Sequence, residues 1–195
     1  MWIEMKDTKD TLKDIFSNVN EWLKFAEEKN AAIIIFNLSS IFGAAHIITQ
    51  AKTVIPQLIL LYLYWLIVLN TLGLSVALFS FWPKTLSLFD NYYDCKKLEK
   101  LDNTLYYGYI KCCEPKSYIT RLCNSLQKEG EENSSFESNY AIQIVINSRV
   151  AFRKYRYFKA ALILTINAIL TPIGYILLYF LLAVVDRDLM IFNRW

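Results

Sequence analysis

The chain has 195 residues, of which 55% are hydrophobic and 15% aromatic, and its mean hydropathy is +0.26. This composition excludes an intrinsically disordered chain. The formal net charge of +3 is too small to suggest a nucleic-acid coat protein. The apolar residues are gathered into long uncharged blocks instead of being spread at the period of a surface helix, which indicates a membrane protein.

Three uncharged blocks are long enough to cross a bilayer as helices. The first, residues 31–49, has 19 residues, which at ~1.5 Å per residue reach about the ~30 Å of a hydrocarbon core. The second, residues 55–82, has 28 residues and would fit by tilting or by projecting past the lipid. The third, residues 160–185, contains Pro172, which we expect to kink the helix without ending it because 26 residues are too few for two crossings.

Lysine and arginine are distributed unevenly around these three spans. Five lie before the first span, one (Lys52) lies between the first and second, thirteen lie from Lys84 to Lys159, and two follow the third span. The positive-inside rule then places residues 1–30 and 83–159 in the cytoplasm. The tail, residues 186–195, is expected on the outside, which agrees with an odd number of spans.

The segment before the first span carries an amphipathic stripe. Its apolar residues recur at steps of three and four, as on one face of a helix, and they are Leu12, Ile15, Phe16, Val19, Leu23 and Ala26. No glycine or proline separates this stripe from Ala31, so we expect one helix that starts in the cytoplasm and runs directly into the bilayer. The alternative is an interfacial helix that lies flat on the membrane.

The central region, residues 83–159, is expected to be a cytoplasmic helical module. Its first helix is predicted from about Pro83 to Leu101, and its second opens at Glu114-Pro115 and continues to Leu126. A third begins at a capping box formed by Ser134 and Glu137 and continues without a breaker into the third span.

The predicted fold class is therefore an all-α membrane protein. It has three transmembrane helices and a cytoplasmic helical module, with helices continuous between the two. Because so small a module is poorly equipped to bury a core alone, we expect neighbouring copies to pack against it in a homo-oligomer.

The sequence offers little material for catalysis or metal binding. It contains no phosphate-cradling glycine loop, no nucleophile elbow and no metal-binding histidine pair. Cys112 and Cys113 are adjacent and so lack the spacing of a zinc pair. The single histidine, His46, has no acidic residue at membrane depth to pair with. We expect no catalytic site, no metal and no cofactor.

Polar residues inside the spans form the first pattern that suggests a function. An uncompensated polar group within a span is costly and usually faces protein or water. Several of these residues lie roughly 10 to 12 Å from the cytoplasmic ends of their spans, and a layer at one depth is what a water-filled path would require. Interhelical hydrogen bonding at small-residue interfaces is the alternative. The candidate pore-lining residues are Asn37, Ser40, Ser75, Asn167 and Thr171.

A basic and aromatic cluster before the third span forms the second pattern. Arg149, Arg153 and Arg156 fall on one helical face at i, i+4 and i+7, with Lys154 and Tyr155 among them. Guanidinium groups offer planar forks for phosphate oxygens, and aromatic rings offer surfaces on which bases stack. The cluster is typical of a site for a phosphorylated ligand. In the alternative interpretation the same cluster meets anionic lipid headgroups and sets the topology.

Three short sequence patterns carry a family resemblance. The first, F-A-D-x-K-A, is matched by Phe25, Ala26 and Lys29, with Glu27 in place of the aspartate and Asn30 in place of the final small residue, and Ala31 follows directly. The second, N-x-L-x-[FY]-G-x-I, is met by Asn103, Leu105, Tyr107, Gly108 and Ile110. The third, Q-I-x-x-N-S-[KR]-[IV]-A-x-x-K-[FY], is met by Gln143, Ile144, Asn147, Ser148, Arg149, Val150, Ala151, Lys154 and Tyr155. Over about residues 20 to 180, the chain resembles the transmembrane effectors of the Pycsar anti-phage defence systems.

The resemblance implies an effector in the bacterial inner membrane that answers a nucleotide messenger made by a partner cyclase or nucleotidyltransferase. The messenger could be a cyclic nucleotide or an oligonucleotide, and it could open a pore or hold it shut, depending on which state it binds more tightly. Disruption of the membrane potential would arrest growth in abortive infection. The main alternative is a non-conducting membrane anchor or adaptor for a soluble partner. We expect the ligand phosphates near the arginine cluster, with four further candidate site residues, Asn103, Tyr107, Gln143 and Asn147.

Overall fold

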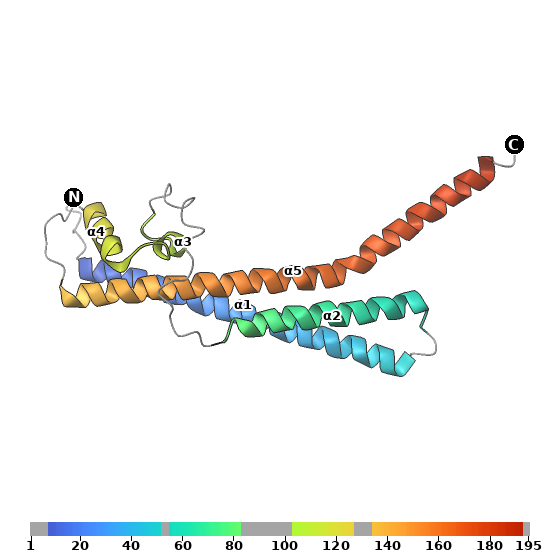
Figure 1. The fold of residues 1–195 in the computed structure, drawn as a ribbon, viewed down its shortest axis with the longest axis horizontal. Helices are drawn as coiled ribbons and strands as arrows, with labels where there is room; N and C mark the ends of the chain where they lie inside the picture. Colours follow the sequence, from blue (N-terminus) through green and yellow to red (C-terminus); the bar gives the residue numbers. More distant parts are fainter. Residues whose placement is uncertain (1–7, 52–54, 83–102, 127–133, 193–195) are drawn as a thin grey trace, which may run out of the picture. The chain divides into compact units, whose positions relative to one another are not determined.

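The computed structural model describes residues 8–51, 55–82, 103–126 and 134–192, and these residues form helices joined by turns, with no strand among them. The helices in chain order are α1 (Thr8–Ala51), α2 (Gln57–Phe79), α3 (Tyr107–Ile110), α4 (Pro115–Ser125) and α5 (Ser135–Phe192) (Figure 1). The predicted all-α class is confirmed. The helix predicted from about Pro83 to Leu101 lies outside the described residues.

Three of these helices are long and apolar enough to cross a membrane, namely α1, α2 and α5. The 23 residues of α2 give a length of about 35 Å, close to the ~30 Å of a hydrocarbon core. The 44 residues of α1 and the 58 residues of α5 give about 66 Å and 87 Å, so both helices must extend beyond the lipid. Pro172 lies inside α5 without ending it, as predicted.

The chain divides into two compact units that share α1 and α5. The first unit contains Met1–Asn30 and Ser80–Phe158, and the second contains Ala31–Phe79 and Lys159–Trp195. Each unit therefore takes one part of α1 and one part of α5, while α2 belongs entirely to the second unit and α3 and α4 belong to the first.

The first unit has a buried apolar core to which α1, α3, α4 and α5 all contribute. The stripe predicted on α1 supplies Leu12, Ile15 and Val19, which repeat at the three- and four-residue steps of a helical face. The hydroxyl of Tyr118 donates a hydrogen bond of 3.0 Å to the carbonyl oxygen of Thr104, which ties α4 to the turn before α3. The buried members of this core are Leu12, Ile15, Val19, Tyr109, Ile110, Cys113, Tyr118, Ile119, Leu122, Cys123, Ala141, Ile144 and Val145.

The predicted helix starts in the first unit are present. The backbone N–H of Ser134 donates to Glu137 Oε2 at 2.8 Å, and the backbone N–H of Glu137 donates to Ser134 Oγ at 3.2 Å, which is the reciprocal geometry of a capping box. Pro115 opens α4, where its missing N–H leaves no intrahelical bond unmade. The four-residue α3 was not predicted, because it is too short to show a period.

In the second unit, small and polar residues bring α1, α2 and α5 close together. The hydroxyl of Thr165 donates to Asn37 Oδ1 at 2.9 Å, which joins α5 to α1. A Cβ atom on Gly73 would lie 3.1 Å from Asn37 Nδ2, so the glycine lets α2 approach the same asparagine closely. Asn37 is completely buried, and it therefore stands where all three membrane helices meet.

The substitution Thr165→Val should destabilise this three-helix contact. It keeps the shape of the side chain but removes the hydroxyl that Asn37 accepts from, and we expect a loss of about 1 kcal/mol, the usual worth of an interhelical hydrogen bond in a membrane. The measurement is thermal unfolding of the purified protein in detergent. Thr171→Val is the matched control, because the Thr171 hydroxyl donates only to the Asn167 carbonyl of its own helix. An equal loss in both variants would contradict the role assigned to Thr165.

Candidate functional site

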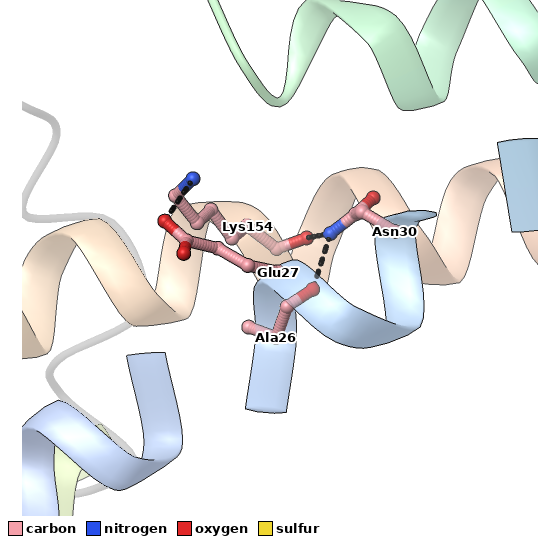
Figure 2. A network of polar contacts seen from close by, with 4 residues as sticks. All are labelled: Ala26, Glu27, Asn30 and Lys154. Carbon is pink, nitrogen blue, oxygen red and sulfur yellow. Dashed lines mark hydrogen bonds and ion pairs between the residues drawn. The ribbon is translucent and has the colours of Figure 1, made fainter. Parts of the chain in front are cut away.

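The candidate site lies in the first unit, where residues from all three sequence patterns meet. The clearest contact joins the first pattern to the third, and Figure 2 shows it. Lys154 Nζ on α5 lies 2.9 Å from Glu27 Oε1 on α1, and the lysine side chain is only 12% exposed. The ammonium also lies 4.9 Å from the centre of the Phe81 ring. Glutamate in place of aspartate thus keeps a carboxylate at this position, and that carboxylate reaches the lysine of the third pattern.

Asn30 fastens the same two helices one turn beyond Glu27. Its Nδ2 group donates to the carbonyl oxygen of Ala26 at 2.8 Å and to that of Lys154 at 3.2 Å (Figure 2). The second bond requires the α5 backbone to lie directly against α1, because an amide side chain is short. Asn30 is completely buried. The ion pair and the amide together fix α1 against α5 close to the residues at which each helix passes from the first unit to the second.

The structure places Arg149 against the main chain that follows α3. Its Nε donates to the carbonyl oxygen of Lys111 at 3.0 Å, and its Nη2 donates to that of Cys113 at 3.1 Å. Two donors of one planar fork therefore hold two backbone acceptors between α3 and α4. Arg149 is therefore bonded to the segment between α3 and α4. Of the other two arginines of the cluster, Arg153 is half-buried and Arg156 is exposed.

The predicted amide residues of the site have separate positions. Asn147 Nδ2 donates to Asn20 Oδ1 at 2.8 Å and so joins α5 to α1. Asn103 Oδ1 accepts the backbone N–H of Leu105 at 3.0 Å, in the manner of an Asx turn that leads toward α3. Gln143 is exposed and lines a shallow groove with Phe16 and Tyr140. The three amides therefore have different surroundings, and the structure does not gather them at one point.

Aromatic rings, in contrast, form a continuous stack across the unit. The ring centres of Trp22 and Tyr107 are 5.4 Å apart, and those of Tyr107 and Tyr155 are 5.7 Å apart with an angle of 29° between the rings. Burial, followed by the influence of Tyr106, raises the pKa of Tyr107, and burial raises the pKa of Tyr155. Both phenols therefore remain neutral at physiological pH. The stack connects α1, α3 and α5.

The second pattern has glycine at position 108 for a steric reason. A Cβ atom at this position would lie 2.8 Å from Cζ of the Tyr106 ring, which is closer than real side chains approach one another. The Tyr106 ring in turn lies 4.9 Å, centre to centre, from that of Tyr107. Glycine therefore leaves the space that lets two consecutive tyrosines keep their rings together.

The sequence did not single out Lys29 as a site residue, yet three rings surround its ammonium. Lys29 Nζ lies 4.2 Å from the ring centre of Phe25 and 5.6 Å from the ring centres of both Tyr155 and Phe158. We call Phe25, Tyr155 and Phe158 the aromatic cage. The i, i+4 spacing of Phe25 and Lys29 could have indicated the first contact. The other two cross from α1 to α5, so no local pattern could have shown them.

The polar residues predicted to line a pore occupy different positions in the second unit. Asn37 is buried against Thr165, and Ser40 is half-buried. The other three are exposed or half-buried and donate to carbonyl oxygens of their own helices: Ser75 to Thr71, Asn167 to Ile163 and Thr171 to Asn167.

Two further polar residues of the second unit, Asn70 and Thr165, are buried and were missed. Each lies in a seam of small residues at helical spacing, Asn70 with Gly73 and Ala77, and Thr165 with Ala161 and Ala168. A search for polar residues in register with glycine and alanine would have found both. Within the part of the chain that the structure describes, no group of three or more His, Cys, Asp or Glu residues could hold a metal ion.

These features define an all-α membrane protein in which two long helices, α1 and α5, each contribute to both units. A family model described as the Pycsar effector protein domain matches residues 11–183. The chain therefore belongs to the Pycsar effector family, and it is a membrane effector of anti-phage defence. The family implies signalling by a cyclic nucleotide that a partner cyclase makes. The search of curated proteins and the search of solved structures each gave no match.

The substitution Glu27→Gln should destabilise the first unit because it leaves the largely buried Lys154 ammonium without a carboxylate. The glutamine amide oxygen can still accept a hydrogen bond from the ammonium but no longer neutralises its charge, so we expect a loss of roughly 1–3 kcal/mol. Glu28→Gln is the matched control, because Glu28 pairs with the exposed Lys24 at 4.0 Å, and such surface pairs contribute between about 0 and 1 kcal/mol. Thermal unfolding of the two purified variants makes the comparison. If Glu27→Gln cost no more than Glu28→Gln, the pair would not be a structural determinant.

Proposed function

We propose that this effector is a homo-oligomeric channel of the bacterial inner membrane, gated by a cyclic nucleotide that binds the first unit in the cytoplasm. Opening of the channel dissipates the membrane potential and arrests growth of the infected cell. The observation that carries the proposal is the continuity of α1 and α5, each of which is one helix that serves both units. The first unit performs no catalytic step in this mechanism. It converts binding into movement.

Helix continuity supplies the coupling between ligand and gate. A hydrogen-bonded helix transmits tilt and rotation along its axis because each turn is bonded to the next. The Glu27–Lys154 pair and Asn30 fasten α1 to α5 just before both helices enter the second unit. A rearrangement of that contact therefore moves two membrane helices together. A nucleotide that binds one arrangement more tightly shifts the population toward it, and this holds whether that arrangement is open or closed.

The ligand site is supported by the basic and aromatic residues of the first unit. Tyr107 and Tyr155 present stacked rings, and Arg153 and Arg156 add positive charge on the turns nearest the membrane. Arg149 supports the site indirectly, since its two hydrogen bonds fix the α3–α4 connection against α5.

Replacement of the three arginines by glutamine is expected to abolish the response to ligand while insertion into the membrane is retained.

Exposed polar side chains support an oligomeric conduction path. Among the described residues, the exposed Asn167 on the membrane part of α5 bonds only to its own helix, as do Ser75 and Thr71 on α2. Polar groups at this depth are costly against lipid and are usually covered by protein or water. Neighbouring protomers would cover them around a hydrated lumen. Asn37, which is bonded inside one protomer, would border the path only after the three-helix contact opens.

The central test is release of a dye from vesicles that contain the purified full-length protein. We expect release to depend on a 3′,5′-cyclic nucleotide, supplied as separate samples of cyclic CMP, cyclic UMP, cyclic AMP and cyclic GMP. Vesicles without protein give the background. An anchor or adaptor cannot release dye with or without nucleotide, so retention of the dye in every sample would reject the channel and favour that role.

Asn167→Leu should change the ion flux through the open channel, because it replaces a polar group of the proposed lumen by an apolar one. We expect at least a severalfold decrease in potassium flux from vesicles. Ile169→Leu is the control, since Ile169 is an exposed apolar residue of the same helix and should lie on the lipid side. Equal flux in Asn167→Leu and the unaltered protein would remove Asn167 from the path.

A further inference from the structure

The ammonium of Lys29 is held in position without an acceptor for its hydrogen atoms. Among the residues that the structure describes, Lys29 has no hydrogen bond and no ion pair, and its contacts are the three rings of the aromatic cage. The neighbouring cations differ in this respect. Lys154 is paired with Glu27, and Arg149 is bonded to two backbone carbonyl oxygens. Lys29 is therefore a positioned positive charge that the described residues of the first unit do not neutralise.

This environment suits an anionic ligand. The faces of aromatic rings attract a cation and fix its place, but they leave the three N–H groups of an ammonium available for stronger oxygen acceptors. Hydrogen bonds between an ammonium and phosphate oxygens are charge-assisted and are among the strong ones. One ammonium group matches the single negative charge of a cyclic phosphodiester.

A groove on α1 begins beside the cage. Asn18, Glu21, Trp22 and Phe25 line it, and Phe25 is also a member of the cage. The Trp22 side chain is 45% exposed, so one part of its ring is open to the groove while another part packs against Tyr107. Aromatic rings of this kind are stacking surfaces for nucleobases. Trp22 and Lys29 are seven residues apart on one helix, about 10 Å along its axis, a separation suited to the base and the phosphate of one nucleotide.

We propose that this groove binds a cyclic mononucleotide, with its base against Trp22 and its phosphate at Lys29. The inference rests on the proposed function and names the place of the ligand within it. The Glu21 carboxylate and the Asn18 amide lie at the base end, where a carboxylate accepts hydrogen bonds from an exocyclic amino group. The phosphate end lies at the cage, away from Glu21.

The position of the groove explains how binding would reach α5. Trp22 packs on Tyr107, Tyr107 stacks on Tyr155, and Tyr155 belongs to the cage around Lys29. A base placed against Trp22 and a phosphate placed at Lys29 therefore touch both ends of one set of rings. Because Tyr155 follows Lys154 on α5, a shift of the Tyr155 ring would also displace Lys154, which is paired with Glu27.

The test is calorimetric titration of the full-length protein in lipid nanodiscs with cyclic CMP, cyclic UMP, cyclic AMP and cyclic GMP. We expect Lys29→Gln and Trp22→Leu each to weaken binding about tenfold or more, the range of one base stack or one phosphate contact. Lys24→Gln is the matched control, because Lys24 is an exposed lysine of the same helix that pairs with Glu28, and its affinity should be unchanged. Circular dichroism checks that all variants remain folded.

The same titrations separate a nucleotide phosphate from a lipid phosphate. They are made in nanodiscs of phosphatidylcholine and of phosphatidylglycerol, with tryptophan fluorescence reporting lipid contact. A loss of nucleotide affinity in both lipids supports the inference. If Lys29→Gln altered only the response to phosphatidylglycerol, Lys29 would be a headgroup ligand and the inference would be overturned. Nucleotide binding that survives both substitutions overturns the inference alone, whereas failure of the unaltered protein to bind any of the four nucleotides overturns the proposed function as well.

Discussion

The arrangement of the first unit depends on one largely buried charge, the ammonium of Lys154. A charge removed from water needs a partner, and the carboxylate of Glu27 at 2.9 Å supplies it from a different helix. The requirement fixes the rotation of α1 and α5 about their own axes, because both side chains must point toward the same place. Asn30 adds a bond that is possible only when the two backbones are close. The remaining contacts of the unit, including the stack of Trp22, Tyr107 and Tyr155, are built on this alignment.

In the second unit, too, a buried polar group is bonded across helices, but the bond joins neutral groups instead of charges. Its interior carries no charge among the described residues, but Asn37 Oδ1 accepts a hydrogen bond from the Thr165 hydroxyl, which also lies 2.9 Å from the carbonyl oxygen of Ala161 on its own helix. Gly73 and the alanines of the seams let the helices approach until such bonds are possible. A single hydrogen bond is easier to exchange than a buried ion pair. Breaking the Asn37–Thr165 contact therefore costs less than breaking the Glu27–Lys154 pair.

The parts of this structure that sequence could predict are those with local causes. The long apolar helices follow from the composition of their own residues, and the start of α5 follows from Ser134 and Glu137, which bond only to each other. The candidate site was harder to predict because its partners are distant in the chain. Helical spacing placed Arg149 on a face of α5 but could not show that the carbonyl oxygens of Lys111 and Cys113 lie opposite. For the same reason the sequence around Lys29 could not indicate its contacts with Tyr155 and Phe158, which lie on α5.

The three sequence patterns acquire a common meaning once their contacts are known. The first pattern places Glu27, which bonds α5, within one turn of Phe25 and Lys29, which line the proposed ligand site. The third places Lys154 and Tyr155 side by side, so that one faces the ion pair and the next faces the cage. The second supplies Tyr107, whose ring lies between Trp22 and Tyr155. The residues of the proposed ligand site and the residues that fasten the helices thus alternate on the same turns of the same two helices. In the proposed mechanism no separate relay would be needed, because a ligand that displaced one group would also displace its neighbour on the backbone.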